Sequence, residues 1–174
     1  MTRAGDDKVL ILVRHAKAEQ GLGTPDHERQ LTLRGRRDAR AVGAWLHEHG
    51  LGPELVLCST ATRTRQTWVE AEMGGACGET VQYDGSLYSG GVETVLRTVR
   101  ESAGEAQVVL VVGHNPTMAA LASELSDGNG STAAHDCLAA GFPTSTVAVL
   151  RHSGSWDELG LGTAALERCH IARG

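Results

Sequence analysis

Runs of branched apolar residues alternate along the chain with segments in which apolar residues recur every three or four positions. The continuous runs at residues 9–13, 55–57 and 108–112 are typical of strands that are buried on both faces. The helical spacing occurs at residues 39–46, 92–99 and 118–125. Strands and helices in alternation predict an α/β domain of three layers, in which helices flank a mostly parallel central sheet.

Shorter apolar stretches predict two further strands, at residues 80–83 and 146–150. The 174 residues contain no internal repeat and no Pro- or Ser-rich linker, which predicts a single domain over residues 1–174. Two stretches, residues 21–30 and 127–143, are too polar or Gly-rich to be core and are expected to be irregular loops. Loops beside a site are candidates for lids.

Composition narrows the class of protein. The chain has 16 Lys and Arg residues against 21 Asp and Glu residues and a net charge of −5, so no general affinity for nucleic acid or an anionic membrane is expected. Its N-terminal stretch has neither the apolar region and cleavage site of a signal peptide nor the length of a membrane span. The four cysteines form no CxxC pair and are interpreted as reduced thiols: Cys58, Cys77, Cys137 and Cys169. Together these features predict a soluble, cytoplasmic protein.

Residues with catalytic potential follow three of the predicted strands. Arg14 and His15 come directly after the first apolar run, Ser59 and then Arg63 come after the second, and His114 follows the third. Ligands of open α/β sheets bind in the crevice outside the carboxyl ends of the strands. These side chains are therefore expected to converge on one pocket.

The segments that follow these strands favour an anionic ligand. Asn115 is a good helix N-cap and Pro116 suits a first helical turn, so free backbone N–H groups are expected to face the pocket. A second helix is expected to start within residues 59–67, where either Arg63 or Arg65 would supply a guanidinium group that matches phosphate. The combination predicts a phosphoryl-binding site.

Such a site suits covalent catalysis by histidine. A neutral ring nitrogen can attack phosphorus while arginines held in advance meet the charge on the transferred oxygens. Neighbouring cations disfavour the protonated imidazole and keep the nucleophile neutral near physiological pH. This chemistry implies no metal ion and no cofactor. The histidines without metal-ligand spacing are His47, His49, His135, His152 and His170.

The same residues resemble the motifs of the histidine phosphatase superfamily, the group named for the phosphoglycerate mutases. Arg14-His15 is similar to its RHG motif, residues 59–67 to its S-x-x-x-R-x-x-Q-T segment, and Gly113-His114 to its second-histidine motif. The resemblance implies a phosphoglycerate mutase-like fold.

The resemblance also implies a role for each matching residue. His15 would be the nucleophile that becomes transiently phosphorylated. The phosphoryl oxygens would be bound by the other three matches, Arg14, Arg63 and His114, whereas Arg65 would lie outside the motif. Two neighbours are candidates for binding the substrate: Asn115 and Lys17.

Within the superfamily, the short chain, the sequence RHAK and the stretch DHERQLTLRGRRDA most resemble the SixA-type phosphohistidine phosphatases. Ala16 replaces the commonest glycine, and Ser89 stands where mutases and phosphomonoesterases of the family carry a glutamate proton donor. An alkoxide leaving group needs such an acid, whereas the imidazole of a phosphohistidine can take a proton from water before the P–N bond breaks. The missing glutamate therefore favours a phosphoramidate substrate.

The sequence thus predicts a hydrolase that removes phosphate from phosphohistidine on a protein and releases inorganic phosphate. Two other interpretations stay open: a phosphomonoesterase that acts on a small phosphorylated metabolite, and a non-catalytic phosphate-binding module. An ester substrate would need another acid, and the candidates are Glu19, Glu28 and Asp84. Residues that could line the rim of the pocket and select substrates are Lys17, Asp26, His27 and Arg29.

Overall fold

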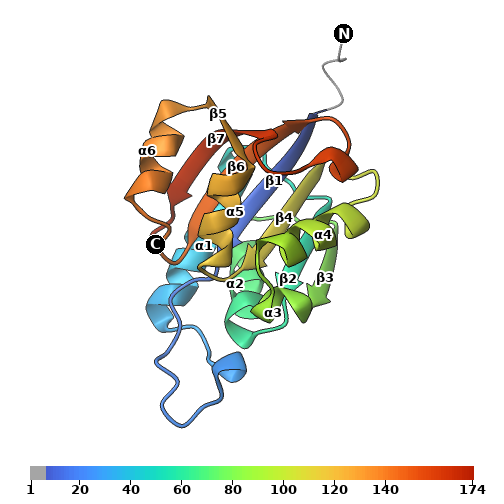
Figure 1. Ribbon diagram of the computed structural model, residues 1–174. Coiled ribbons are helices and arrows are strands. Elements are labelled where there is room, and N and C mark those ends of the chain that lie inside the picture. Colours follow the sequence, from blue (N-terminus) through green and yellow to red (C-terminus); the bar gives the residue numbers. More distant parts are fainter. Residues whose placement is uncertain (1–6) are drawn as a thin grey trace.

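The central sheet has seven strands within residues 7–174, the part of the chain that the structure, a computed structural model, describes. They are β1 (Asp7–Arg14), β2 (Leu55–Ser59), β3 (Thr80–Asp84), β4 (Val108–Gly113), β5 (Ser126–Gly130), β6 (Thr146–Ser153) and β7 (Ala164–Ile171). The spatial order is β3-β2-β4-β1-β6-β7-β5 (Figure 1). Only β6 runs antiparallel to its neighbours, β1 and β7, among the pairs in these residues. The mostly parallel α/β sheet is confirmed.

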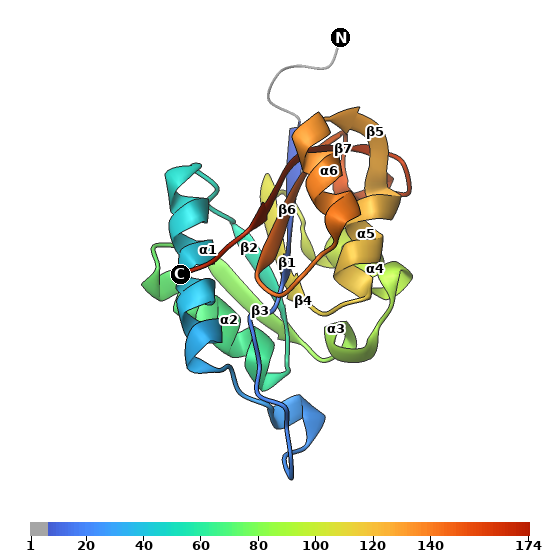
Figure 2. The same ribbon diagram turned by 90° about the vertical axis from the view of Figure 1, so that its left-hand side faces the viewer.

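Helices cover both faces of the sheet, which makes three layers (Figure 2). The longer helices are α1 (Leu33–Glu48), α2 (Thr62–Met73), α4 (Val92–Ser102), α5 (Thr117–Leu125) and α6 (Thr132–Ala140). A short helix, α3 (Ser86–Ser89), and two 3₁₀ helices, η1 (Asp26–Glu28) and η2 (Trp156–Glu158), complete the helical segments of the described residues. α1 and α2 lie on one face, and α4, α5 and α6 lie on the other (Figure 2).

The two helical layers explain why β1 is apolar at successive positions. Leu10 and Leu12 belong to the core shared with α4 and α5, whereas Ile11 and Val13 belong to the core shared with α1 and α2. Side chains of a strand alternate between its faces, so a strand covered on both sides needs apolar residues throughout. β1 therefore lies between the two helical layers and is packed on both faces close to its carboxyl end.

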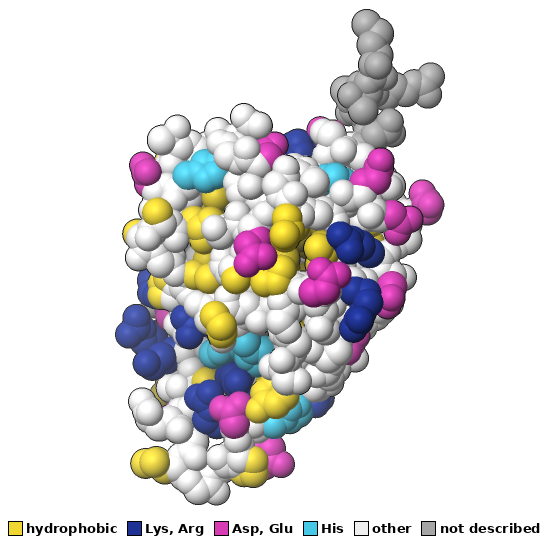
Figure 3. Space-filling model, viewed as in Figure 1, with side chains coloured by type: hydrophobic (Ala, Val, Ile, Leu, Met, Phe, Trp, Pro, Cys, Tyr) yellow, Lys and Arg dark blue, Asp and Glu magenta, His cyan; other side chains and the backbone are white. Residues whose placement is uncertain are grey.

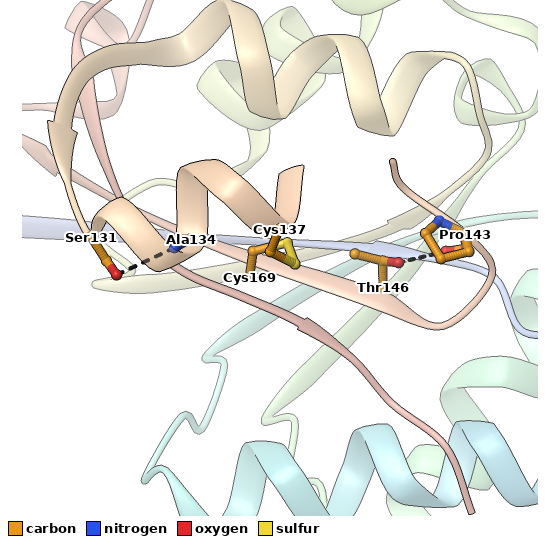
Figure 4. The surroundings of a disulfide bond; sticks show 6 residues. All are labelled: Ser131, Ala134, Cys137, Pro143, Thr146 and Cys169. Atoms are coloured by element: carbon orange, nitrogen blue, oxygen red, sulfur yellow. Dashed lines mark hydrogen bonds between the residues drawn. A yellow bond between two sulfur atoms is a disulfide. The ribbon is translucent and has the colours of Figure 1, made fainter. Parts of the chain in front are cut away.

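The expectation of an irregular loop at residues 127–143 is wrong. This stretch contains most of β5 and all of α6. The hydroxyl of Ser131 accepts a hydrogen bond from the backbone N–H of Ala134 and caps α6, a local signal inside an otherwise polar segment (Figure 4). β7 was also not expected, because it is half-buried and carries Glu167 and Arg168 in place of a continuous apolar run.

The interpretation of all four cysteines as reduced thiols is wrong as well. Cys137 on α6 and Cys169 on β7 form a disulfide with a Cα–Cα distance of 5.9 Å (Figure 4). Their separation of 32 residues gave no spacing signal, because the pair meets only when α6 packs against β7. Cys58 is a buried free thiol and Cys77 an exposed one.

Between residues 7 and 174, no helix combines the length and the apolar character that crossing a bilayer requires.

Candidate active site

The carboxyl ends of β2, β4 and β1 meet at one edge of the sheet, because these adjacent strands are parallel. Arg14 ends β1 opposite Gly113 of β4, and the backbone N–H of His15 donates to the carbonyl oxygen of Gly113 at 3.0 Å. This register places His15 and His114 side by side, with ring centroids 5.4 Å apart and ring planes inclined by 58°.

The two histidines line a polar pocket of about 310 Å³. Its other lining residues are Arg14, Lys17, Ala18, Glu19, Gln20, Arg29, Arg63, Asn115 and Thr144. All six residues predicted for catalysis or substrate binding therefore lie around one cavity. On the molecular surface, histidine and basic side chains gather toward the lower part of the face in Figure 3.

His15 is held as a neutral ring with one free nitrogen. Its Nδ1 lies 2.7 Å from the carbonyl oxygen of Ala16, which can only accept, so Nδ1 carries the hydrogen and donates. The lone pair of Nε2 is then available. Burial, and after it the charges of Arg63 and Arg14, lower the pKa of His15 to about 4, although the bond to Ala16 opposes the shift. At neutral pH His15 is therefore uncharged and able to attack an electrophile.

The guanidinium groups of Arg14 and Arg63, the two arginines predicted to bind phosphate, are held by hydrogen bonds. Arg14 donates from Nη1 to the carbonyl oxygen of Phe142 at 3.0 Å. Arg63, only 5% exposed at the start of α2, donates from Nη1 to the carbonyl oxygen of Asp26 at 2.7 Å and from Nη2 to its Oδ2 at 3.1 Å. In the described chain, the buried Nε of each arginine has no hydrogen-bond partner.

His114 is buried beside Ser59, the last residue of β2. Its Nε2 lies 2.8 Å from the hydroxyl oxygen of Ser59, while its buried Nδ1 has no partner within residues 7–174. Burial, followed by the charges of Arg63 and His15, lowers the pKa of His114 to about 3. This ring is also neutral near physiological pH.

Arg65 does not reach the pocket. It lies over the ring of Tyr83, with the guanidinium carbon 5.3 Å from the ring centroid. It lies two positions after Arg63 on α2, about half a helical turn away, so the two side chains point in different directions. Only Arg63 of the two candidates lines the cavity.

Asn115 lines the pocket but does not occupy the N-cap position as expected. α5 begins at Thr117, and Pro116 precedes it. The side chain of Asn115 donates from Nδ2 to the carbonyl oxygen of Phe142 at 2.8 Å and accepts from the backbone N–H of Ala119 at 3.3 Å. Asn115 thus joins the start of α5 to the segment before β6, at the same carbonyl that Arg14 uses.

Residues 17–31 form a closed loop beside the pocket. Its ends are joined because Thr32 donates its backbone N–H to the carbonyl of Lys17 at 2.9 Å, and Glu19 donates its own to Gln30 at 2.8 Å. Within it, Asp26 accepts from Arg63, and also from Nε of Arg29 at 3.0 Å. Of the four expected rim residues, Lys17 and Arg29 line the cavity, and Asp26 binds the arginines. His27 is not among the lining residues, and its Nε2 lies 2.9 Å from the hydroxyl oxygen of Thr60.

Tyr88 is a site residue that the sequence analysis missed. From α3 it donates its hydroxyl to Oδ2 of Asp26, and its ring meets the ring of His114 edge-on at 5.6 Å. The hydrogen bond from Tyr88, together with those from the arginines, holds the pKa of Asp26 well below its usual range. Asp26 is therefore an anion at neutral pH and cannot serve as an acid. No motif marks Tyr88, and the contact joins residues 62 positions apart.

Candidate proton donors are few. Among the described residues that line the pocket, Glu19 is the only one with a carboxyl group. Glu28 instead lines a neighbouring cavity of about 530 Å³ within the loop, and Asp84 accepts a hydrogen bond from the backbone N–H of Ser86. Ser89 is not among the lining residues. The part of the chain that the structure describes contains no cluster of three or more His, Cys, Asp or Glu side chains able to hold a metal ion.

Comparison with known proteins identifies the family. The sequence model of the histidine phosphatase superfamily (branch 1) matches residues 10–88. A protein of Mycobacterium tuberculosis without an assigned function is 38% identical over 162 residues, which cover 92% of this chain and all of that protein. The chain belongs to the histidine phosphatase superfamily, whose members act on phosphorylated substrates.

Two solved structures carry the comparison further. A protein from Nakamurella multipartitia, provisionally assigned as the phosphohistidine phosphatase SixA, has 36% identity and a TM-score of 0.84 over 99% of both chains. A protein from Agrobacterium tumefaciens with the same provisional assignment has 31% identity and a TM-score of 0.70 over 94% of this chain and 95% of that one. The chain is similar to both over nearly its whole length.

Proposed function

We propose that the protein is a phosphatase that transfers a phosphoryl group to Nε2 of His15 and then hydrolyses it, with phosphohistidine on a protein as the substrate. The observation that carries the proposal is a set of three buried nitrogens around His15. Nε of Arg14, Nε of Arg63 and Nδ1 of His114 have no partner in residues 7–174. A phosphoryl group offers the acceptor oxygens that they lack.

The positions of these nitrogens suit phosphoryl transfer. Their residues lie at or just after the carboxyl ends of three adjacent strands and line the same cavity as His15, whose Nε2 is free. The transferred group carries charge on its oxygens, and donors that are fixed in advance stabilise it without reorganisation. Here the two guanidinium groups are fixed by hydrogen bonds, from Arg14 to the carbonyl oxygen of Phe142 and from Arg63 to that of Asp26.

The reaction would proceed in two displacements at phosphorus. First, the Nε2 lone pair of His15 forms a bond to phosphorus and the P–N bond of the substrate breaks. The leaving imidazole keeps that electron pair and carries on its other nitrogen a proton taken from water. Second, a water molecule attacks the phosphorylated His15, the Nε2–P bond breaks, and Nε2 recovers its lone pair. Inorganic phosphate leaves with one proton of that water, and the other proton passes to solvent, where it replaces the proton taken from water in the first step.

The scarcity of carboxyl groups supports a P–N substrate. A phosphoramidate can be protonated by solvent before its bond breaks, whereas an ester needs an acid within reach of the leaving oxygen. Asp26 is an anion tied to arginines, and Glu19 is the remaining carboxyl group at this cavity in the described residues. The provisional assignment of the similar structures from Nakamurella multipartitia and Agrobacterium tumefaciens agrees with this preference.

Glu19 also gives the alternative substrate its best support. If Glu19 reaches the leaving oxygen of a small phosphomonoester, the same covalent mechanism would hydrolyse an ester. The variant Glu19→Gln separates the two cases, because it removes an acid while keeping the size of the side chain. It should leave hydrolysis of phosphohistidine unchanged within about threefold and reduce any ester hydrolysis by about 100-fold.

The test is release of inorganic phosphate from a protein phosphorylated on histidine and from a panel of phosphomonoesters, in the presence of EDTA. His15→Ala should abolish release, while His47→Ala, a change at an exposed histidine, should not. Arg63→Ala should lower kcat/KM by about 100-fold. Arg65→Ala is its matched control on the same helix and should have little effect.

Other results would redirect the proposal. Faster turnover of one ester than of phosphohistidine would move the protein to the phosphomonoesterases of the family. Release that persists in His15→Ala would exclude His15 as the nucleophile. No release from any substrate, with inorganic phosphate still bound, would leave a phosphate-binding module.

A further inference from the structure

Ser59 makes two contacts through its hydroxyl group. Its Oγ lies 2.8 Å from Nε2 of His114 and 3.3 Å from the backbone nitrogen of Ala61. The side chain is completely buried, and no further partner of this hydroxyl occurs in residues 7–174. Because an amide N–H can only donate, Ala61 takes up one lone pair of Oγ.

These contacts distinguish between the two neutral forms of the His114 ring. If Nε2 carried the hydrogen, both Nε2 and the amide of Ala61 would donate to Oγ, and the hydroxyl hydrogen of Ser59 would be buried without an acceptor. If Nδ1 carries it, the hydroxyl donates to Nε2 and still accepts from Ala61. Only the second arrangement satisfies every group at Ser59, and buried polar groups in proteins are nearly always satisfied.

We propose that Ser59 is a positioning residue that fixes His114 as the Nδ1–H tautomer, so that this N–H is donated to an oxygen of the phosphoryl group. The inference rests on the proposed function and deepens it. Nδ1 of His114 is one of the buried nitrogens that lack a partner within the described chain. As an N–H it completes the set of donors around the substrate.

The tautomer matters because a neutral imidazole has one donor and one acceptor nitrogen. Phosphoryl oxygens only accept, so an Nδ1 lone pair would repel them, whereas an Nδ1–H binds them. A doubly protonated ring would donate from both sides, but burial and Arg63 lower the pKa of His114 to about 3. The hydrogen bond between Ser59 and Nε2 therefore determines whether Nδ1 of His114 attracts or repels a phosphoryl oxygen.

The two histidines of the site would then have opposite arrangements. In His15 the Nδ1–H binds the carbonyl of Ala16, and Nε2 presents its lone pair to phosphorus. In His114, Ser59 occupies Nε2, and Nδ1 presents its hydrogen to oxygen. One ring supplies the nucleophile and the other supplies a donor, although both are neutral.

The direct test is nitrogen NMR of the wild-type protein at pH 7, in which couplings between ring nitrogens and carbon-bound hydrogens distinguish the tautomers. His114→Asn identifies the signals of His114 by their loss. We expect Nδ1 to be the protonated nitrogen. A protonated Nε2 in the wild-type protein would overturn the proposal, whatever the activity.

Substitution gives the second test. Ser59→Ala should change the tautomer ratio of His114, lower kcat by about 10- to 100-fold and weaken inhibition by orthovanadate to a similar degree. Ser59→Thr keeps the hydroxyl group and should restore both the tautomer and most of the rate.

Thr64→Val is the matched control. The Thr64 hydroxyl is buried in the same turn and donates to the carbonyl of Ser59 at 2.8 Å, but it does not bind His114. Thr64→Val should lower stability without changing the tautomer. If Ser59→Ala changed only stability, as Thr64→Val does, the proposal would be wrong. The Nδ1–H form in a protein that hydrolyses no phosphorylated substrate would support the tautomer assignment and overturn the proposed function.

Discussion

Asp26 holds Arg63 with two of its own oxygens, the backbone carbonyl at 2.7 Å from Nη1 and Oδ2 at 3.1 Å from Nη2. The arginine belongs to α2 and the aspartate to the loop of residues 17–31, so the loop determines how the guanidinium group faces the pocket. The same carboxylate accepts from Arg29 through Oδ1. One half-exposed side chain therefore positions two arginines of the cavity.

Asp26→Ala is expected to lower kcat/KM by about 10-fold, because a charge-assisted hydrogen bond that orients Arg63 is worth about 1.5 kcal/mol. Tyr88→Phe removes only the hydrogen bond from Tyr88 to Asp26 and should have a smaller effect in the same direction. Steady-state kinetics on the preferred substrate measure both. A higher kcat/KM in Asp26→Ala would mean that the carboxylate competes with the phosphoryl group for Arg63.

Activity should persist in acid well below the usual range of histidine. The pKa of His15 is lowered to about 4, so the neutral, nucleophilic ring is present above that pH and is lost as pH falls through it. A profile of kcat/KM against pH should therefore have its acid limb near pH 4, after spontaneous loss of phosphate from the substrate is subtracted. A limb between pH 6 and 7 would mean that the site does not depress the pKa.

The Cys137–Cys169 disulfide should stabilise the oxidised protein. It closes a loop of 32 residues, for which the chain-entropy model gives about 3–4 kcal/mol. Replacing both cysteines by serine should lower the free energy of unfolding in urea by that amount under oxidising conditions. Under reducing conditions the variant and the wild type should agree, and a persistent difference would assign the effect to packing.

Ser145 has a left-handed backbone, with φ of 62°, directly beside His15. Its N–H donates to the carbonyls of Arg14 and His15, each at 3.2 Å, which holds this conformation in place. The left-handed conformation costs a residue with a side chain about 1–2 kcal/mol. Ser145→Gly should therefore raise the free energy of unfolding by up to about 1 kcal/mol. Ser145→Ala keeps the strained backbone and serves as the control. A Gly variant less stable than the Ala variant would contradict this explanation.

The sequence predicted the parts of the molecule that local patterns specify. Continuous apolar runs marked β1, β2 and β4, and the residues just after them marked His15 and His114, because a parallel sheet brings its carboxyl ends to one edge. β7 was not predicted, because it is only half-buried and its sequence contains no such run.

Contacts between distant segments could not be predicted. The hydrogen bond of Arg14 to Phe142 spans 128 residues and uses a backbone carbonyl, which has no sequence signature. The contact between Tyr88 and Asp26 likewise has no sequence signal, because it depends on the loop of residues 17–31 lying beside α3 in the folded protein. Ser59 was recognised as part of a motif, but its partner became visible only in the structure.

The placement of β4 between β2 and β1 also bears on the order in which the protein forms during synthesis. β1 and β2 are made first, yet neither pairs with the other, since each is paired with β4. A nascent chain that has emerged only as far as α3 carries His15 and Arg63 but lacks β4, the strand that brings them together. The pocket therefore forms only after residue 113 has left the ribosome, and a truncated product that ends before that point would lack both β4 and His114.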